Sequence, residues 1–401
     1  MVFQTVPAAL KNDINFLITD NQNEKNIIRT NNLEEKVNLL IIRDLQRLNW
    51  SIQYKEKKIE ITPPEYYDKE VIKYSMSIKR MEIINKNKSW IDNHIDYARN
   101  NLADGVDVLK SQIQPVIEVC STQKQYDLFR LYRYFWSSPY SEYVGRRIKL
   151  IIRDAGLVNK PVIGIAALGS PIIHIPARDK YIGWNKDTRT KKINYMMDAY
   201  VIGALPPYNY LLGGKLISVL LTSKEIRRIF KKKYKNTAYS ELAGLFTTSL
   251  YEKSSQYNRI VYDGRKIYEP IGNTKGFGTL HLTMETINTM VDYLRKKNII
   301  VSNVFGNGPS WTMRVIRTTG DLLGFDTDQL LTHSFKRKIY FIPFAKNTKK
   351  YLNGENEKLD FYSKNIDILT EYWKNRWYNN RRNNFEIIKK VFDFKKENFI
   401  I

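Results

Sequence analysis

Few residues of this chain suit disulfide or metal chemistry. One cysteine, Cys120, stands in 401 residues, so no internal disulfide can form, which suits a reducing cytosol. Its surroundings, VIEVCST, are typical of a strand in which the thiol packs as a small hydrophobic group rather than acting as a nucleophile. The four histidines lie far apart and match no zinc spacing, so we expect no metal site.

Long apolar runs and nucleotide-hydrolysis motifs are also missing. No stretch approaches the roughly 18 apolar residues that a membrane span requires, so we expect no membrane partner. The first residues show neither a basic leader nor a small-residue cleavage site, which favours a cytoplasmic location. The segment LLGGKL lacks the outer glycine of a P-loop and the hydroxyl that would hold magnesium.

Positive charge is what the chain has in excess. Sixty-five Lys and Arg against 41 Asp and Glu give a net charge of +24, which makes DNA or RNA the first partner to consider. Abundant Lys, Asn and Ile are also what an AT-rich genome produces, so part of the excess has that alternative reading. Between 129 and 153, arginines alternate with aromatic residues, as in nucleic-acid-binding surfaces and in ordinary amphipathic helices. The contacts expected there are Arg130, Arg133, Arg146 and Arg147, among rings that include Tyr140 and Tyr143.

Hydrophobic periodicity predicts three regions. Residues 1–115 form a helical region with a short hairpin, residues 116–300 an α/β core, and residues 301–401 a basic, partly helical extension. Short apolar runs that alternate with helices indicate an α/β or α+β class with a mixed central sheet flanked by helices. The expected strands are 116–119, 149–153, 162–168, 196–205, 245–249, 260–262 and 266–271. The expected helices are 34–48, 68–110, 125–136, 213–234 and 285–297.

The stretch 193–221 reads as a strand, a tight loop and a helix. The apolar run from Met196 to Leu205 ends at two prolines, and Gly213 and Gly214 precede a regular helical pattern. A helix that begins at a glycine pair presents unpaired N–H groups to an anion, and Lys215 adds a charge. The cofactor-binding residues expected here are Leu212, Gly213, Gly214 and Lys215. The alternative is that the glycines only allow close packing of the helix on the strand.

Two polar segments in the core offer further site residues. The insert 178–194 lies between two expected strands, and it should lie over the sheet end beside Gly213 with Trp184 facing the cleft. Its expected nucleic-acid contacts are Arg178, Trp184 and Arg189, although internal ion pairs in an ordered lid explain the same residues. In TTSLYEKSSQYNR, Tyr257 could donate a proton and Arg259 could contact nucleic acid, while packing is the alternative for the tyrosine.

Four long stretches carry a resemblance to a known family. They are 129–154, 162–221, 245–282 and 333–347, and the second includes GSPIIHIPARDKYIGWNKDTRTKKINYMMDAYVIGALPPYNYLLGGK. With these stretches the chain resembles the DruA family of the Druantia anti-phage system from about residue 30 to about residue 380. The resemblance implies a role in defence against phage, and other defence-system proteins as possible partners.

A fold-level resemblance to the GNAT acyltransferases, including the Mom-like enzymes that modify DNA adenine, concerns the core. In that fold, strands such as 162–168 and 196–205 lie side by side, a loop and helix grip the pyrophosphate of acyl-CoA, and a later tyrosine protonates the leaving thiolate. The resemblance places Leu212, Gly213 and Gly214 at the pyrophosphate and Tyr251 or Tyr257 at the acid. The usual loop begins with Arg or Gln and spaces its glycines differently, so the cofactor stays undetermined.

Three functions follow from these residues. The first is a defence protein that binds nucleic acid through a basic GNAT-like core and transfers an acyl or related group to it, with Tyr257 as the acid. The second is a non-catalytic nucleic-acid-binding module of a multi-protein system. The third is a nuclease or base-modifying enzyme, for which the clustered acids, Asp179, Asp187 and Asp198, match no metal motif. Whether the protein is an enzyme is left open.

Overall fold

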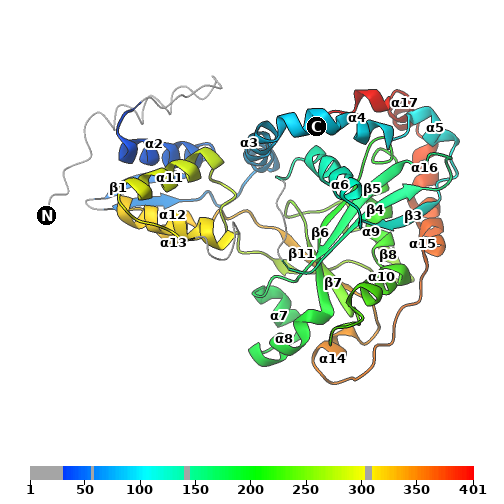
Figure 1. The fold of residues 1–401 in the computed structure, drawn as a ribbon. Helices are drawn as coiled ribbons and strands as arrows, with labels where there is room; N and C mark the ends of the chain where they lie inside the picture. Colours follow the sequence, from blue (N-terminus) through cyan, green and yellow to red (C-terminus); the bar gives the residue numbers. More distant parts are fainter. Residues whose placement is uncertain (1–29, 56–57, 140–144, 303–308) are drawn as a thin grey trace. The chain divides into compact units, whose positions relative to one another are not determined.

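The computed structural model describes residues 30–55, 58–139, 145–302 and 309–401, which form two compact units (Figure 1). Unit 1 holds the described residues within 30–83, 137–139 and 275–336, and unit 2 holds those within 84–136, 145–274 and 337–401. The units therefore differ from the expected boundaries at 115 and 300. Segments far apart in the sequence fold together, which hydrophobic periodicity along the chain does not reveal. Tyr140 and Tyr143 lie outside the described residues.

Unit 1 is helical with one hairpin. Helix α2 begins after Asn32, whose side chain accepts from the backbone N–H groups of Glu34 and Glu35, and it packs along α11. Apolar residues at helical spacing on α2, among them Val37 and Ile41, are fully buried. The elements are α2 (Leu33–Gln46), β1 (Ser51–Lys55), β2 (Lys58–Thr62), most of α3 (Lys69–Lys86), α11 (Met284–Lys296), α12 (Pro309–Leu323) and α13 (Thr327–Leu330).

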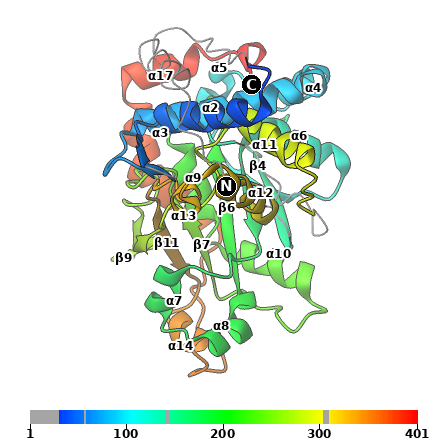
Figure 2. The ribbon, with the colours of Figure 1, turned by 90° about the vertical axis from the view of Figure 1, so that its left-hand side faces the viewer.

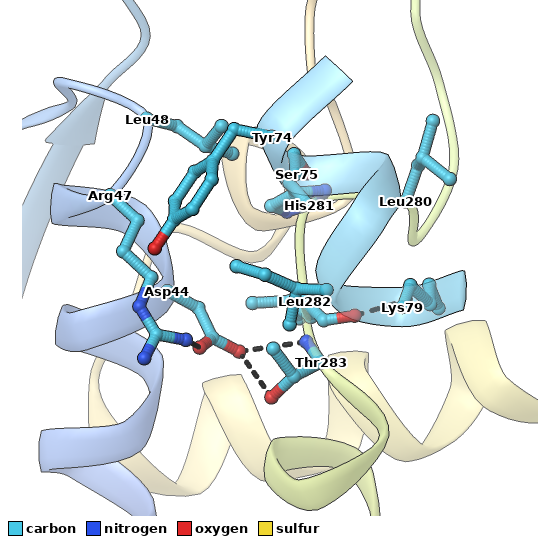
Figure 3. A pocket seen from close by; sticks show the side chains of 11 residues that line it. Asp44, Arg47, Leu48, Tyr74, Ser75, Lys79, Leu280, His281, Leu282 and Thr283 are labelled. Carbon is cyan, nitrogen blue, oxygen red and sulfur yellow. Dashed lines mark hydrogen bonds and ion pairs between the residues drawn. The ribbon is translucent and has the colours of Figure 1, made fainter. Parts of the chain in front are cut away.

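A buried carboxylate joins α2 to the start of α11 in unit 1. Figure 3 shows Asp44 directed at Thr283, whose backbone N and Oγ1 donate to Asp44 Oδ2 over 2.7 and 2.9 Å. Arg43 completes the network by pairing with Asp44 (3.1 Å) and with Glu285 (2.9 Å). On α3, Lys79 donates to two backbone carbonyls of the segment before α11, and burial lowers its pKa to about 8.

Unit 2 is built on a seven-stranded mixed sheet in the order β10-β11-β7-β6-β5-β4-β3. Neighbouring strands of the sheet run antiparallel, except that β6 and β7 run parallel to each other. The mixed sheet flanked by helices confirms the expected fold class at that level. The strands are β3 (Pro115–Val119), β4 (Arg147–Asp154), β5 (Val162–Gly169), β6 (Met196–Ala204), β7 (Gly244–Thr248), β10 (Glu269–Asn273) and β11 (Lys338–Pro343).

Helices cover both faces of this sheet. One face, here called the α9 face, packs against α9 (Gly213–Leu220), α10 (Lys224–Tyr234), α15 (Ile366–Trp373), a π-helical turn at Lys374–Tyr378 and α17 (Phe385–Phe392). The opposite face packs against α4 (Lys88–Asn100) and α6 (Gln123–Phe135) over β4 and β5. Over β6, β7 and β11 that same face packs against α7 (Pro176–Ile182) and α14 (Thr348–Leu352), and Figures 1 and 2 show α8 (Lys186–Lys192) near them.

Several expected elements differ from the structure. Strand β11, KIYFIP, was expected in a helical extension, yet it pairs with both β7 and β10 inside the sheet. The expected helix 213–234 breaks into α9 and α10 at Thr222 and Ser223. Residues 260–262 pair in a separate hairpin of β8 (Val261–Tyr262) and β9 (Arg265–Lys266). The remaining α-helices of unit 2 are α5 (Gly105–Lys110) and α16 (Asn379–Arg382).

Among the described residues, no helix is long and apolar enough to cross a membrane. The longest apolar stretches are strands β5 and β6, and helices or neighbouring strands bury both. This burial accounts for their composition, because a strand covered on both faces reads as a continuous apolar run.

The Asp44 network gives a stability prediction for unit 1. Asp44→Ala removes the acceptor for α11 and leaves Arg43 buried without its main partner, which should lower the free energy of unfolding by about 3–5 kcal/mol. Urea unfolding followed by circular dichroism measures the loss. The exposed pair Asp292–Arg295 on α11 supplies the control, since Asp292→Ala should change stability by less than about 0.5 kcal/mol. Equal effects of the two substitutions would contradict the role given to Asp44.

Candidate nucleic-acid interface

Strands β6 and β7 pair over only part of their length. The parallel ladder joins Met196 to Gly244, Met197 to Leu245 and Asp198 to Phe246, and β6 then continues to Ala204 paired with β5 but not with β7. Beyond the ladder, the next hydrogen bond between the two strands comes from a side chain, because Thr247 Oγ1 donates to the carbonyl of Ala199 over 2.7 Å. The two parallel strands therefore diverge toward the start of α9.

The loop between β6 and α9 satisfies most of its own donors. Each backbone N–H from residue 209 to residue 213 donates to a carbonyl of the loop, including that of Gly213 to Tyr208 over 2.9 Å. Leu212 adopts a left-handed conformation at the N-cap of α9, and its carbonyl accepts from Trp373 Nε1. The glycine pair therefore does not form an open row of N–H groups. An added Cβ would meet Tyr208 O at 2.7 Å from Gly213, but no atom closer than 3.4 Å from Gly214.

The space between the diverging strands is occupied by the segment that follows β7. Gln256 Nε2 donates to the carbonyl of Ile202 on β6 (3.2 Å) and to Ser218 Oγ on α9 (2.9 Å). Lys215 is only 6% exposed, and its Nζ donates to the carbonyls of Ser255 and Gln256. The predicted role of Lys215 at a cofactor phosphate stays a prediction, and its ammonium group already serves to hold this segment.

The three residues predicted to be catalytic are not brought together. Tyr257 is 8% exposed on the α9 face, stacked on Tyr268 with centroids 4.8 Å apart, and burial raises its pKa to about 12. Asp198 lies between Met197 and Ala199 on β6, both of which face α9, so alternation directs its side chain to the opposite face. Asp179 pairs with Arg178 and Arg189.

The prediction that Trp184 faces a cleft beside Gly213 is wrong. Trp184 packs with Met196 and Phe246. The residues adjacent to these on the same strands, Met197 and Leu245, face α9 instead. Its indole Nε1 donates to the carbonyl of Leu352. The flanking strands β5 and β6 are neighbours as expected, but the insert folds into α7 and α8 on the other face of the sheet.

Most of the predicted nucleic-acid contacts serve internal structure. Arg178 is fully buried and donates to the carbonyls of Ile172 and Ile173, which corrects its assignment as an accessible contact. The other largely enclosed arginines are Arg133 (9% exposed), Arg146, which donates to Asn194 O and Met196 O, Arg189, which pairs with Asp179, and Arg130, which donates to Tyr134 and Asn87. Arg147 and Arg259 are exposed.

Arg259 belongs to a group of cations that sequence reasoning only partly found. Arg259 and Arg376 lie near Lys215, and after burial their positive charges are the next causes that lower its pKa to about 8. Trp377 lies between the charges, with its ring centroid 5.0 Å from Lys215 Nζ and 5.4 Å from Arg376 Cζ. We call Lys215, Arg259, Arg376 and Trp377 the Lys215 cluster. The basic run with Trp373, Arg376 and Trp377 near the end of the sequence was the available signal.

Metal and CoA sites receive little support from this geometry. Among the described residues, no group of three or more His, Cys, Asp or Glu could hold a metal ion. A CoA pyrophosphate does not fit the divergence between β6 and β7 as it stands, because the loop donors of 209–213 are satisfied and Gln256 fills the gap. The residues around the start of α9 therefore support no catalytic step that uses acyl-CoA.

Comparison with known proteins decides the family. A profile of the family described as "Druantia protein DruA" matches residues 65–354. The Druantia protein DruA of Escherichia coli (strain UMEA 4076-1) is 37% identical over 301 residues, covering 72% of this chain and 74% of that protein. The chain belongs to the DruA family. Membership of this Druantia family implies a role in anti-phage defence. No solved structure matches the chain significantly, so the likeness of the core to GNAT enzymes stays a prediction.

The match to the DruA family extends across both units. Residues 65–354 include the whole of α3, α11, α12 and α13, and all seven strands of the sheet in unit 2. The cation at Arg259 lies within the matched range, while Arg376 and Trp377 lie beyond it.

The roles of the two glycines at the start of α9 can be separated experimentally. Gly213→Ala places a Cβ against the Tyr208 carbonyl and the Ala204 side chain, so it should lower the free energy of unfolding by about 1–3 kcal/mol. Gly214→Ala has room and improves helix propensity, so urea unfolding should show unchanged or slightly higher stability. If Gly214→Ala unfolds the protein as readily as Gly213→Ala, this account of the loop is incorrect.

Proposed function

We propose that this DruA-family protein acts in anti-phage defence by binding nucleic acid, DNA or RNA, at the Lys215 cluster. The observation that carries the proposal is the crowding of Arg259 and Arg376 around Lys215. Neither arginine has a carboxylate partner in the part of the chain that the structure describes. Like charges repel one another, so an anion bound between them is stabilising, and the guanidinium group of arginine pairs well with a phosphate group.

The position of the cluster supports binding to a polyanion. Arg259 and Arg376 are exposed, so their guanidinium groups can reach a phosphate while Lys215 stays buried beneath them. The net charge of +24 attracts a polyanion over a longer range and raises its rate of encounter. No recognition helix is needed for this mode, because contacts to phosphates carry no sequence information.

Binding should depend steeply on salt and on the two arginines. On duplex DNA, the logarithm of affinity should fall against the logarithm of salt with a slope of about −0.9 for each phosphate neutralised. The double variant Arg259→Gln, Arg376→Gln should bind more weakly and reduce the magnitude of that slope by about 2. Fluorescence anisotropy with a labelled oligonucleotide at several salt concentrations measures both quantities.

A matched control lies on the other side of the sheet. Lys124 is exposed on α6, which packs on the face opposite α9, so Lys124→Gln should leave the slope nearly unchanged. Absence of binding at low salt would contradict the proposed function. A double variant that behaves like Lys124→Gln would contradict the assignment of the Lys215 cluster.

Group transfer to nucleic acid is a second candidate function. The observation that favours it is the order of the neighbouring strands β5 and β6, the loop and α9, as in the acyltransferases that the core resembles, with the space between β6 and β7 beside α9. Opening that space requires Gln256 to leave Ile202 and Ser218. The non-catalytic module requires no such opening, and other defence proteins would then act on the bound nucleic acid.

Thermal unfolding with excess acetyl-CoA tests the second candidate. Ligand that binds the folded state raises the melting temperature, and Gln256→Ala should enlarge the rise by clearing the space. Mass spectrometry of small molecules that remain with the purified protein provides an independent reading. An unchanged melting temperature in both proteins, together with no bound CoA derivative, would contradict group transfer from acyl-CoA.

A further inference from the structure

Cations and aromatic rings continue from the Lys215 cluster across the α9 face of unit 2. The ring of Trp377 contacts Tyr372, and Tyr372 contacts Tyr262 of β8, with centroid distances of 5.4 and 4.9 Å. Beyond them, Lys364 Nζ lies 3.1 Å from the ring centroid of Tyr262. Arg265 Cζ of β9 lies 3.5 Å from that of Tyr362. We call Trp377, Tyr262, Tyr362, Arg376, Lys364 and Arg265 the cation–ring strip.

The rings hold the cations without neutralising them. A cation over an aromatic face is attracted by the ring quadrupole, but its full charge remains available to a ligand. Carboxylates do occur nearby, since Glu371 pairs with Lys374 and Asp263 lies near Lys364. Even so, burial and the charge of Arg265 lower the pKa of Lys364 to about 8, which agrees with an excess of positive charge along the strip.

Several rings of the strip also remain accessible. Trp377, Tyr262 and Tyr362 are partly exposed, and Trp377 and Tyr262 also pack against the core of the α9 face. These rings lie on the hairpin β8–β9, on the π-helical turn and on the segment before α15. Tyr372 of α15 joins that helix to the hairpin, because its Oη donates to the carbonyl of Val261 on β8. The strip thus places partly exposed rings beside cations that form no salt bridge within the part of the chain that the structure describes.

Rings beside phosphate-binding cations suit a nucleic acid with unpaired bases. In a duplex, the faces of each base are covered by its neighbours in the stack, so an exposed ring gains little there. In a single strand, bases can stack on aromatic side chains while Arg and Lys contact the backbone. Resting on the proposed function, we propose that the cation–ring strip binds single-stranded nucleic acid and that the protein prefers an unpaired strand to a duplex.

The test compares one labelled sequence as a single strand and as a duplex, by fluorescence anisotropy at fixed salt. The unmodified protein should bind the single strand more tightly. The double variant Tyr262→Leu, Tyr362→Leu, which leaves the Lys215 cluster unchanged, should lose about 10-fold or more in single-strand affinity, because each stacked base contributes substantially to binding. Its duplex affinity should change by less than about 3-fold, and its salt slope should be unchanged because no charge is removed.

Two further variants keep the outcome interpretable. Tyr262→Phe, Tyr362→Phe retains ring faces and should recover most of the single-strand affinity, whereas a general packing defect would not distinguish Phe from Leu in this way. Tyr66→Leu, at a tyrosine that is 70% exposed in unit 1, controls for loss of any surface ring and should have no effect. Melting temperatures of all variants report folding.

The possible results separate the two proposals. Equal or tighter binding of the duplex, or equal losses for both ligands in the Leu variant, overturns the preference for an unpaired strand while leaving nucleic-acid binding in place. Failure to bind either ligand at low salt overturns the proposed function itself. Weak single-strand binding by the Phe variant as well as the Leu variant also counts against stacking on these rings.

Discussion

The short parallel ladder between β6 and β7 is the constraint on which the candidate interface depends. Because only three residue pairs join these strands, the carbonyls of Ala199 and Ile202 farther along β6 accept from the side chains of Thr247 and Gln256 instead. Gln256 and Lys215 fix the segment after β7 to β6 and α9, and Arg259 follows a few residues later at the surface. The incomplete pairing of β6 and β7 thus leaves room for this segment, and the contacts of the segment fix the position of Arg259 beside Lys215.

The C-terminal residues complete the same surface. Trp373 donates to the carbonyl of Leu212 just before α9, which anchors α15 and sets the position of the following turn. That turn carries Arg376 and Trp377 to the Lys215 cluster, and Tyr372 joins them to the hairpin β8–β9. A family role in anti-phage defence and a surface of exposed cations and rings are consistent with recognition of nucleic acid.

The sequence predicted what depends on local pattern. Strands β3 to β7 and helix α2 were found because alternation and helical spacing are visible in short windows. Strand β11 was missed because KIYFIP lies within a basic stretch, and its place between β7 and β10 depends on distant partners. The burial of Arg178 and the position of Trp184 likewise depend on which face of β6 the insert returns to, and spacing along the chain carries no information on that choice.

Photochemical cross-linking is the most direct test of where nucleic acid binds. A single strand carrying photoreactive bases, irradiated in complex with the full chain and digested, should cross-link to peptides that contain Tyr262, Tyr362 or Trp377. Cross-links confined to α4, α6 or unit 1, with these peptides unmodified, would contradict the central claim that the α9 face of unit 2 is the nucleic-acid interface.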